Sequence, residues 1–120
     1  MAFDPSIATE PYCYLTTCGR VSGEPREIEI WFALEAGVLF LMAGGRERAH
    51  WVRNLQHQPA VSVRIRGVTH AARARIVAPG TPEDVRARVL LYEKYQPTYD
   101  KNLRGWADSS LPVAIEVAER

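Results

Sequence analysis

Two short segments with strand character, joined by a glycine-rich basic turn, constrain the fold of this chain more than any other stretch. Residues 12–17 (YCYLTT) are β-branched and aromatic enough to form a strand, and residues 27–32 (EIEIWF) alternate with a period of two. The connection between them is broken by Gly19, Gly23 and Pro25. The sequence therefore predicts a β-hairpin with a connection of six or seven residues.

The predicted turn is also a candidate binding site. Its glycines, Gly19 and Gly23, let backbone N–H groups approach a ligand closely, and Arg20, Ser22 and Arg26 add side-chain donors. Such a turn can hold a phosphate or a carboxylate. The alternative is a solvated hairpin loop, because basic residues are common in turns.

The remaining chain predicts a small, mainly antiparallel barrel with helices at its ends. No strand–helix–strand alternation occurs that would favour a parallel sheet, so we expect five or six strands and two or three helices. Further strands are expected at residues 38–42, 60–66, 69–77 and 111–117, and helices at residues 46–58, 82–95 and 98–106.

Length and composition narrow the class of protein. At 120 residues the chain is long enough for a single domain, which we expect at residues 12–120 behind an N-terminal arm at residues 1–11. The longest apolar run, residues 37–43, is much shorter than the roughly 20 residues of a membrane helix. A net charge of +1 gives no reason to expect nucleic acid as a partner. A cytoplasmic protein is expected.

The two cysteines fit that location. Cys13 and Cys18 lie five residues apart on one predicted strand, so their side chains point to opposite faces and cannot easily form a disulfide. We interpret both as reduced thiols, which is typical of a cytosolic chain.

A metal centre is not expected. The only histidines are His50, His57 and His70; the first two lie seven residues apart on one predicted helix face, without a third ligand at a metal-type spacing. No nucleophile with an evident base is present either.

Two other segments are candidates for ligand contact. The predicted helix at residues 46–58 follows the diglycine Gly44-Gly45, and a helix N-terminus can bind an anion or a carbonyl oxygen. Asn54 lies in the middle of this predicted helix, where an asparagine is mildly unfavourable for helix formation, so we expect its side chain to hydrogen-bond to backbone. An aromatic-rich segment near the end of the chain could cover a flat heterocycle or pack against the barrel end; it contains Tyr92, Tyr95, Tyr99 and Trp106.

Three blocks of sequence resemble the deazaflavin-dependent nitroreductase family. Residues 14–26 (YLTTCGRVSGEPR) resemble its LTTxGRxSGxPR signature. The diglycine followed by Trp51, Asn54, Leu55, Pro59 and Val61 resembles its GG, W..NL and P.V block. The closing Tyr-Pro-x-Tyr, Trp and Ile-Pro-Ile/Val segment is matched by residues 95–99, by Trp106 and by Leu111-Pro112-Val113. These blocks cover almost all of the chain after residue 11, in the right order.

The resemblance implies a split β-barrel related to the flavin-dependent pyridoxamine-phosphate oxidases. It also implies transfer of a hydride from reduced coenzyme F420, an 8-hydroxy-5-deazaflavin, to a small electrophile such as a quinone, nitroaromatic or enone. By the same resemblance, Tyr99 would be the catalytic residue, placed over the ring as a hydrogen-bond donor to the acceptor. The cofactor-binding residues that it implies are Arg20, Val21, Ser22 and Arg26 for the phosphate and tail, Ile28, Glu29, Ile30, Trp31, Phe32, Leu41, Met42, Ala43 and Gly44 along the deazaflavin, and His50, Trp51 and Asn54 from the helix.

The sequence departs from the family at two positions that are often lysine. They are Val21 and Ala43 here, while Glu27 and Glu29 add negative charge nearby. These changes leave flavin mononucleotide as an alternative cofactor, and they leave open a haem-using split barrel or a non-catalytic coenzyme-binding module. A homodimer is expected because related split barrels pair through their sheets.

Overall fold

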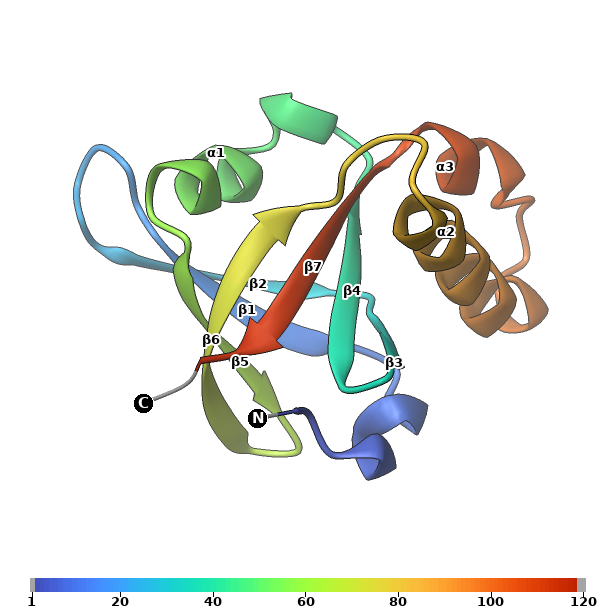
Figure 1. The fold of residues 1–120 in the computed structure, drawn as a ribbon, viewed down its shortest axis with the longest axis horizontal. Helices are drawn as coiled ribbons and strands as arrows, with labels where there is room; N and C mark the ends of the chain where they lie inside the picture. The colour runs from blue at the N-terminus through green and yellow to red at the C-terminus, as the bar shows by residue number, and fades with distance from the viewer. Residues whose placement is uncertain (1, 119–120) are drawn as a thin grey trace.

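The computed structural model describes residues 2–118 (Figure 1); Met1 and residues 119–120 of the predicted arm and domain lie outside the described residues. One seven-stranded sheet dominates it, in the order β2-β1-β5-β6-β7-β4-β3, and every neighbouring pair is antiparallel. The strands are β1 (Cys13–Cys18), β2 (Pro25–Ile30), β3 (Ala33–Glu35), β4 (Val38–Ala43), β5 (Ala60–Ile65), β6 (Val68–Ile76) and β7 (Leu111–Val117). The predicted antiparallel barrel is confirmed, with seven strands where five or six were expected.

The two edge strands are consecutive in the chain, and this closes the sheet. Only Trp31 and Phe32 separate the end of β2 from the start of β3, which occupy opposite edges of the sheet. Three Cα–Cα steps span at most about 11 Å, so the sheet must curl until its edges nearly meet. The result is a split barrel whose opening lies along β2 and the 31–32 link.

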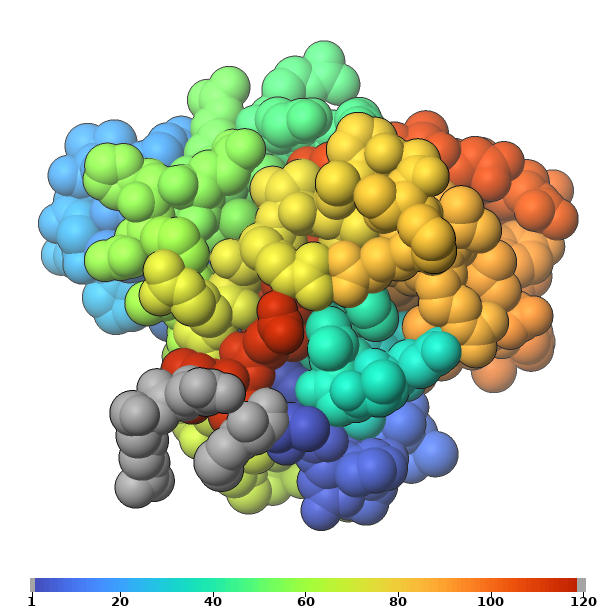
Figure 2. Space-filling model, in the orientation of Figure 1, coloured from blue at the N-terminus to red at the C-terminus, as the bar shows by residue number. Residues whose placement is uncertain are grey.

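The helices lie at two places on the barrel. Figure 1 shows α2 and α3 together beside β4, and α1 on the other side near the β1–β2 turn. Figure 2 shows the same separation on the surface, with the blue turn and the green α1 region at one end and the orange residues at the other. The α-helices are α1 (His50–His57), α2 (Pro82–Tyr95) and α3 (Arg104–Ser109), and the 3₁₀ turns are η1 (Pro5–Thr9), η2 (Arg46–Arg48) and η3 (Gln96–Thr98).

Strand β4 is apolar throughout because both of its faces are buried. Leu39 and Leu41 point into the barrel, where both are fully buried. Phe40 and Met42 belong instead to the apolar cluster that the sheet forms with α2 and α3. Both faces of the strand are therefore covered, as the run VLFLM predicted.

Two predicted helices were wrong in extent. The helix expected at residues 46–58 begins only at His50, because Arg46 has φ of 52° and Ala49 is extended with ψ of 135°. The diglycine therefore leads into the short η2 and not into the N-terminus of α1. In the segment expected to be helical at residues 98–106, Thr98 ends the turn η3, residues 99–103 form a loop, and α3 starts at Arg104.

The length of the hairpin connection and the bounds of two further elements are confirmed. The hairpin connection is the six residues between Cys18 and Pro25, and both α2 and β7 have the predicted bounds. No helix of the described residues is long and apolar enough to cross a membrane. The cytoplasmic location stays a prediction.

Candidate functional site

Asn54 joins the basic turn to α1. It is only 4% exposed, although it lies in the middle of the helix. Its Oδ1 accepts hydrogen bonds from the backbone N of Arg20 (3.2 Å) and from Arg20 Nη1 (2.8 Å), while its Nδ2 donates to Thr17 Oγ1 (3.1 Å). The predicted hydrogen bond between the Asn54 side chain and the backbone is confirmed, with the Arg20 N–H as donor, and it fixes the turn on the helix.

The Arg20 side chain folds back over the start of α1. Its Nη2 lies 3.2 Å from His50 Nδ1, and its Nη1 is 3.5 Å from the His50 carbonyl oxygen. Since the guanidinium can only donate, His50 Nδ1 must act as the acceptor in this contact. Arg20 and His50 thus form one polar group from two distant parts of the sequence.

Gly19 allows the turn to close tightly. Its N–H donates to the Glu24 carbonyl at 2.8 Å, and a Cβ atom at this position would lie 2.9 Å from Ser22 Oγ and 3.0 Å from Glu24 O. Ser22 Oγ also accepts from Arg26 Nη2 at 3.3 Å. No larger residue fits at position 19 unless the turn moves.

These residues surround a pocket that we call the turn pocket. It has a volume of about 670 Å³, and Ile28 of β2 and Trp51 of α1 supply its apolar walls. Its lining is Thr17, Gly19, Arg20, Val21, Ser22, Arg26, Ile28, His50, Trp51 and Asn54. Arginine donors beside an apolar wall suit a ligand that carries both a phosphate and a hydrocarbon part.

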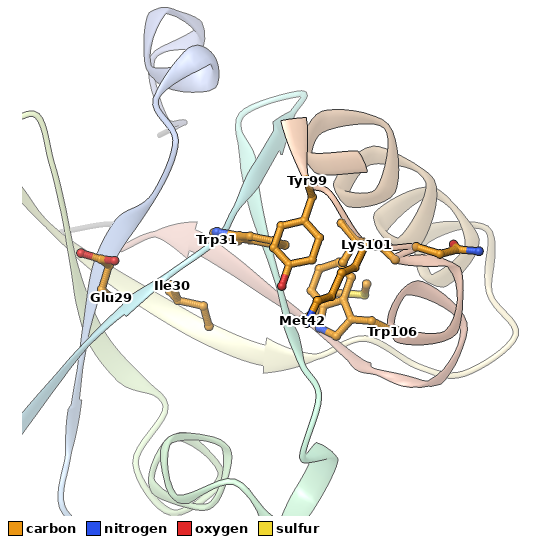
Figure 3. Close-up of a pocket in the computed structure, with 9 residues that line it drawn as sticks. Glu29, Ile30, Trp31, Met42, Tyr99, Lys101 and Trp106 are labelled. Atoms are coloured by element: carbon orange, nitrogen blue, oxygen red, sulfur yellow. The ribbon is translucent and has the colours of Figure 1, made fainter. Parts of the chain in front are cut away.

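The second pocket, the aromatic pocket, lies at the other end of β2 (Figure 3). Its volume is about 580 Å³. The Trp31 ring meets the rings of Tyr99 and Trp106 nearly at right angles, with centroids 5.4 and 5.6 Å away. The lining is Glu29, Ile30, Trp31, Met42, Tyr99, Lys101, Asn102, Leu103 and Trp106.

The two pockets are adjacent along the open edge of β2. Ile28 lines the turn pocket and Ile30 lines the aromatic pocket, and residues two apart on a strand point to the same face about 7 Å apart. An elongated ligand lying along β2 can therefore reach both pockets. The structure thus brings Arg20 and Trp51 together in one pocket and Tyr99 and Trp31 together in the next.

Some residues of the predicted set cannot offer a side chain to a ligand. Phe32 and Leu41 are fully buried in the barrel core, and Ala43 is 2% exposed. Their backbone remains for such a contact, so the prediction that they run along the cofactor stays a prediction about backbone contacts. Gly44 lies against the Trp106 indole, since a Cβ there would be 3.6 Å from it. Val21 is 95% exposed at the rim of the turn pocket.

The sequence prediction missed the loop at residues 99–103. Lys101, Asn102 and Leu103 line the aromatic pocket with Tyr99, although this segment was expected to be helical. Gln96 shapes the loop: its Nε2 donates to Lys101 O at 2.9 Å, and its Oε1 accepts from Leu103 N at 2.6 Å. The only feature of the sequence that indicated this loop was the polar run after Tyr99.

Buried titratable groups lie behind the aromatic pocket. Burial raises the pKa of the Tyr95 hydroxyl and lowers the pKa of the Lys94 ammonium to about 8. Burial also raises the pKa of the Cys13 thiol to about 12. Cys13 and Cys18 are both free, and neither lines the two pockets.

The three histidines are dispersed. His50 lies in the turn pocket, His57 is exposed on α1, and His70 contacts the Phe3 ring. Among residues 2–118 no group of three His, Cys, Asp or Glu side chains is arranged to hold a metal ion.

A family model described as F420H(2)-dependent quinone reductase matches residues 5–118 of the chain. Several solved structures have the same fold as this chain. The F420-H2 dependent reductase FDR-A is 26% identical with a TM-score of 0.64, and the match covers 88% of this chain and 93% of that one. A domain-swapped dimer is 25% identical with a TM-score of 0.68, covering 88% of this chain and 79% of the other.

A more distant match shows how widely the fold is shared. HutZ, the heme storage protein of Vibrio cholerae, is 16% identical with a TM-score of 0.74, and the match covers 100% of this chain and 93% of HutZ. At that identity the likeness concerns the fold alone.

Proposed function

Because the chain belongs to the F420H2-dependent quinone reductase family, we propose that its two pockets together hold one molecule of coenzyme F420 beside a small, flat electrophile. The protein is an F420-dependent reductase with a split-barrel fold, and F420 is its cofactor, so the alternative of flavin mononucleotide is not needed. The observation that carries the proposal is that β2 runs from the basic turn pocket to the aromatic pocket.

The turn pocket fits the phosphate of the cofactor. Arg20 is held by Asn54 and His50, so its guanidinium loses little freedom when it binds an anion. Arg26 is nearby, although Glu24 lies 3.9 Å from it and competes for its charge. Arg20 is therefore the principal phosphate ligand in this proposal.

The aromatic pocket suits the deazaflavin ring and the acceptor. When bound, F420H2 supplies the hydride, and the protein binds, orients and protects the reacting groups. Tyr99 is 41% exposed, and no hydrogen bond of its hydroxyl to another group occurs within residues 2–118. That hydroxyl is free to donate a hydrogen bond to an acceptor oxygen on which negative charge develops. Quinones, nitroaromatics and enones all present such an oxygen.

The binding mode is tested by comparing two ligands. Arg20→Ala should weaken binding of F420 by roughly 10- to 100-fold, the equivalent of one charge-assisted hydrogen bond of about 1.5–3 kcal/mol. The 8-hydroxy-5-deazaflavin fragment that lacks the phosphate should bind the variant and the wild type equally. Deazaflavin fluorescence measures both affinities. Arg53→Ala, an exposed α1 residue whose Nε bonds to Glu47 O, is the control of equal charge.

An equal loss for both ligands would show that Arg20 does not bind the phosphate. Failure of the wild-type protein to bind micromolar F420 would contradict the proposed function as a whole.

Tyr99→Phe tests the role of the hydroxyl. We expect kcat with a quinone to fall roughly 10- to 100-fold while the Kd for F420 stays within about twofold, because the hydroxyl acts on the acceptor. Tyr92→Phe on α2 is the matched control, since Tyr92 contacts Arg104 and lies outside both pockets. Unchanged turnover in Tyr99→Phe would remove Tyr99 from the mechanism.

We also propose a homodimer. Strand β2 pairs with β1 alone among the described strands, which leaves one edge free for association. A domain-swapped dimer among the structural relatives lends support. Light scattering on the eluting protein distinguishes one chain from two.

A further inference from the structure

Trp31 is held from behind by a residue that does not line either pocket. Tyr95, at the end of α2, stacks on the Trp31 ring with centroids 4.3 Å apart and an interplanar angle of 4°. Tyr95 is 6% exposed, whereas Trp31 is partly exposed and forms part of the aromatic pocket. The plane of the Trp31 indole is thus set by a buried ring of another element.

The same tyrosine holds the backbone that follows Trp31. The buried Phe32 N–H donates to Tyr95 Oη at 2.9 Å. Tyr95 Oη also lies 2.7 Å from Pro11 O and 2.9 Å from Phe32 O, so its single hydrogen can serve either carbonyl. Lys94 Nζ donates to the same Phe32 carbonyl at 2.8 Å. One turn of α2 therefore fixes the 31–32 link through both its N–H and its C=O.

We infer that Tyr95 is a positioning residue for the acceptor side of the site, acting through Trp31. This inference rests on the proposed function, because it assigns Trp31 the wall against which the flat acceptor lies. The ring of Tyr95 sets the tilt of Trp31, and its hydroxyl sets the position of the Phe32 peptide. Since Tyr99 and Trp106 both meet Trp31 edge-on, a rotation of Trp31 changes the shape of the whole aromatic pocket.

A purely structural role for Tyr95 makes a different prediction. A tyrosine that only filled the core would affect stability and leave acceptor binding unchanged. The contacts argue otherwise, because the ring of Tyr95 stacks on Trp31, which faces the pocket, and its hydroxyl accepts from the N–H of the next residue, Phe32, besides its contact with Pro11 O. Tyr95→Phe keeps the stacked ring and removes the hydroxyl that accepts from Phe32 N, so the variant distinguishes the positioning role of Tyr95 from its packing role.

The experiment compares Tyr95→Phe, Tyr95→Leu and the control Tyr92→Phe with the wild type. We expect KM for a quinone to rise roughly tenfold in Tyr95→Phe and further in Tyr95→Leu, while the Kd for F420 stays within about twofold. The Trp31 indole N–H resonance, assigned by its loss in Trp31→Phe, should shift in both Tyr95 variants. Tyr92→Phe should change none of these values.

The outcomes separate this inference from the proposed function. An unshifted Trp31 resonance in Tyr95→Phe would overturn the inference, and so would an unchanged quinone KM accompanied only by a lower unfolding temperature. Failure of the wild type to bind F420 would overturn the proposed function instead, while the Trp31 resonance, recorded without any ligand, would still report whether Tyr95 holds the indole.

Discussion

At the scale of the residue, the site depends on a few polar side chains that hold other side chains in place. Asn54 is the clearest case, because the hydrogen bonds of its side-chain amide within residues 2–118 go to the hairpin and not to its own helix. A buried amide is costly unless its groups are paired. Asn54 meets that condition only when the turn adopts the geometry that presents Arg20 to the turn pocket.

Asn54→Ala should therefore harm both stability and binding. Thr17 Oγ1 and the Arg20 N–H lose their partner, which should lower the free energy of unfolding by about 1–3 kcal/mol. With Arg20 less constrained, the Kd for F420 should rise as well. Urea unfolding and fluorescence titration measure the two effects. Gln56→Ala, an exposed position on the same helix, should alter neither.

At the scale of the element, ion pairs join strands β6 and β7 to helix α2. Arg75 on β6 makes a paired contact with Glu83 on α2, at 2.6 and 2.8 Å, and its Nε donates to Glu116 on β7 at 2.9 Å. One guanidinium thus connects three elements. The hydrogen bond from Arg75 lowers the pKa of Glu83.

The lowered pKa of Glu83 predicts how the stability of the protein depends on pH. A carboxylate whose pKa is lower in the folded state stabilises the protein above its unfolded pKa, here near 4.5, and that contribution is lost as the pH falls through the folded pKa. Glu83→Gln should cost roughly 0.5–1 kcal/mol at pH 7, because the pair is partly exposed. The difference from wild type should shrink as the pH falls below 4.5 and should disappear once the pH is below the lowered pKa of Glu83, which denaturant unfolding at several pH values measures.

Glu93→Gln is the control for that experiment, because Glu93 is exposed on the same helix. A gap between wild type and Glu83→Gln that persisted at low pH would show that the ion pair is not its cause.

The elements that the sequence predicted well carry their own boundary signals. Helix α2 begins after Thr81, whose Oγ1 accepts from Asp84 N, and Pro82 follows at the first helical position. The start of α1 had no such signal, since it depends on the positive φ of Arg46, which the sequence does not mark. The loop after η3 depends on Gln96, whose partners lie up to seven residues away.

The candidate site was predictable only in part. Arg20 and Ser22 could be found because glycines mark their turn, and Asn54 because it is unfavourable inside a helix. The aromatic pocket could not be assembled from the sequence, because Trp31 and Trp106 meet only through the tertiary packing of α2 and α3 on the sheet. Resemblance to a family supplied positions, but it could not distinguish the buried Leu41 from the pocket-lining Ile30.

At the scale of the whole molecule, the N-terminal segment packs against the barrel core. Phe3 is 2% exposed and Ile7 is 7% exposed, and both belong to the barrel core with Leu15 and Phe32. Arg66 on the β5–β6 turn donates to Glu10 at 3.0 Å and to the Ser6 carbonyl at 2.9 Å. We propose that residues 2–11 fold with the barrel and are not a separate arm.

Phe3→Ala tests this proposal. Loss of a fully buried phenylalanine should lower the free energy of unfolding by about 3–5 kcal/mol, as in the centre of a core. Asp4→Leu, at the exposed neighbouring position, should cost much less. An effect of Phe3→Ala below about 1 kcal/mol in urea unfolding would mean that the segment is an independent arm.

The two residues between β2 and β3 serve the barrel and the site at once, with Phe32 inside the core and Trp31 in the aromatic pocket. Their adjacency limits how acceptor preference can be altered by directed evolution. Libraries that vary residue 31 while keeping Phe32 and Tyr95 should yield folded enzymes with new acceptor ranges. Libraries that vary all three positions should yield mostly misfolded proteins, because Phe32 fills the barrel core and Tyr95 holds its backbone in place.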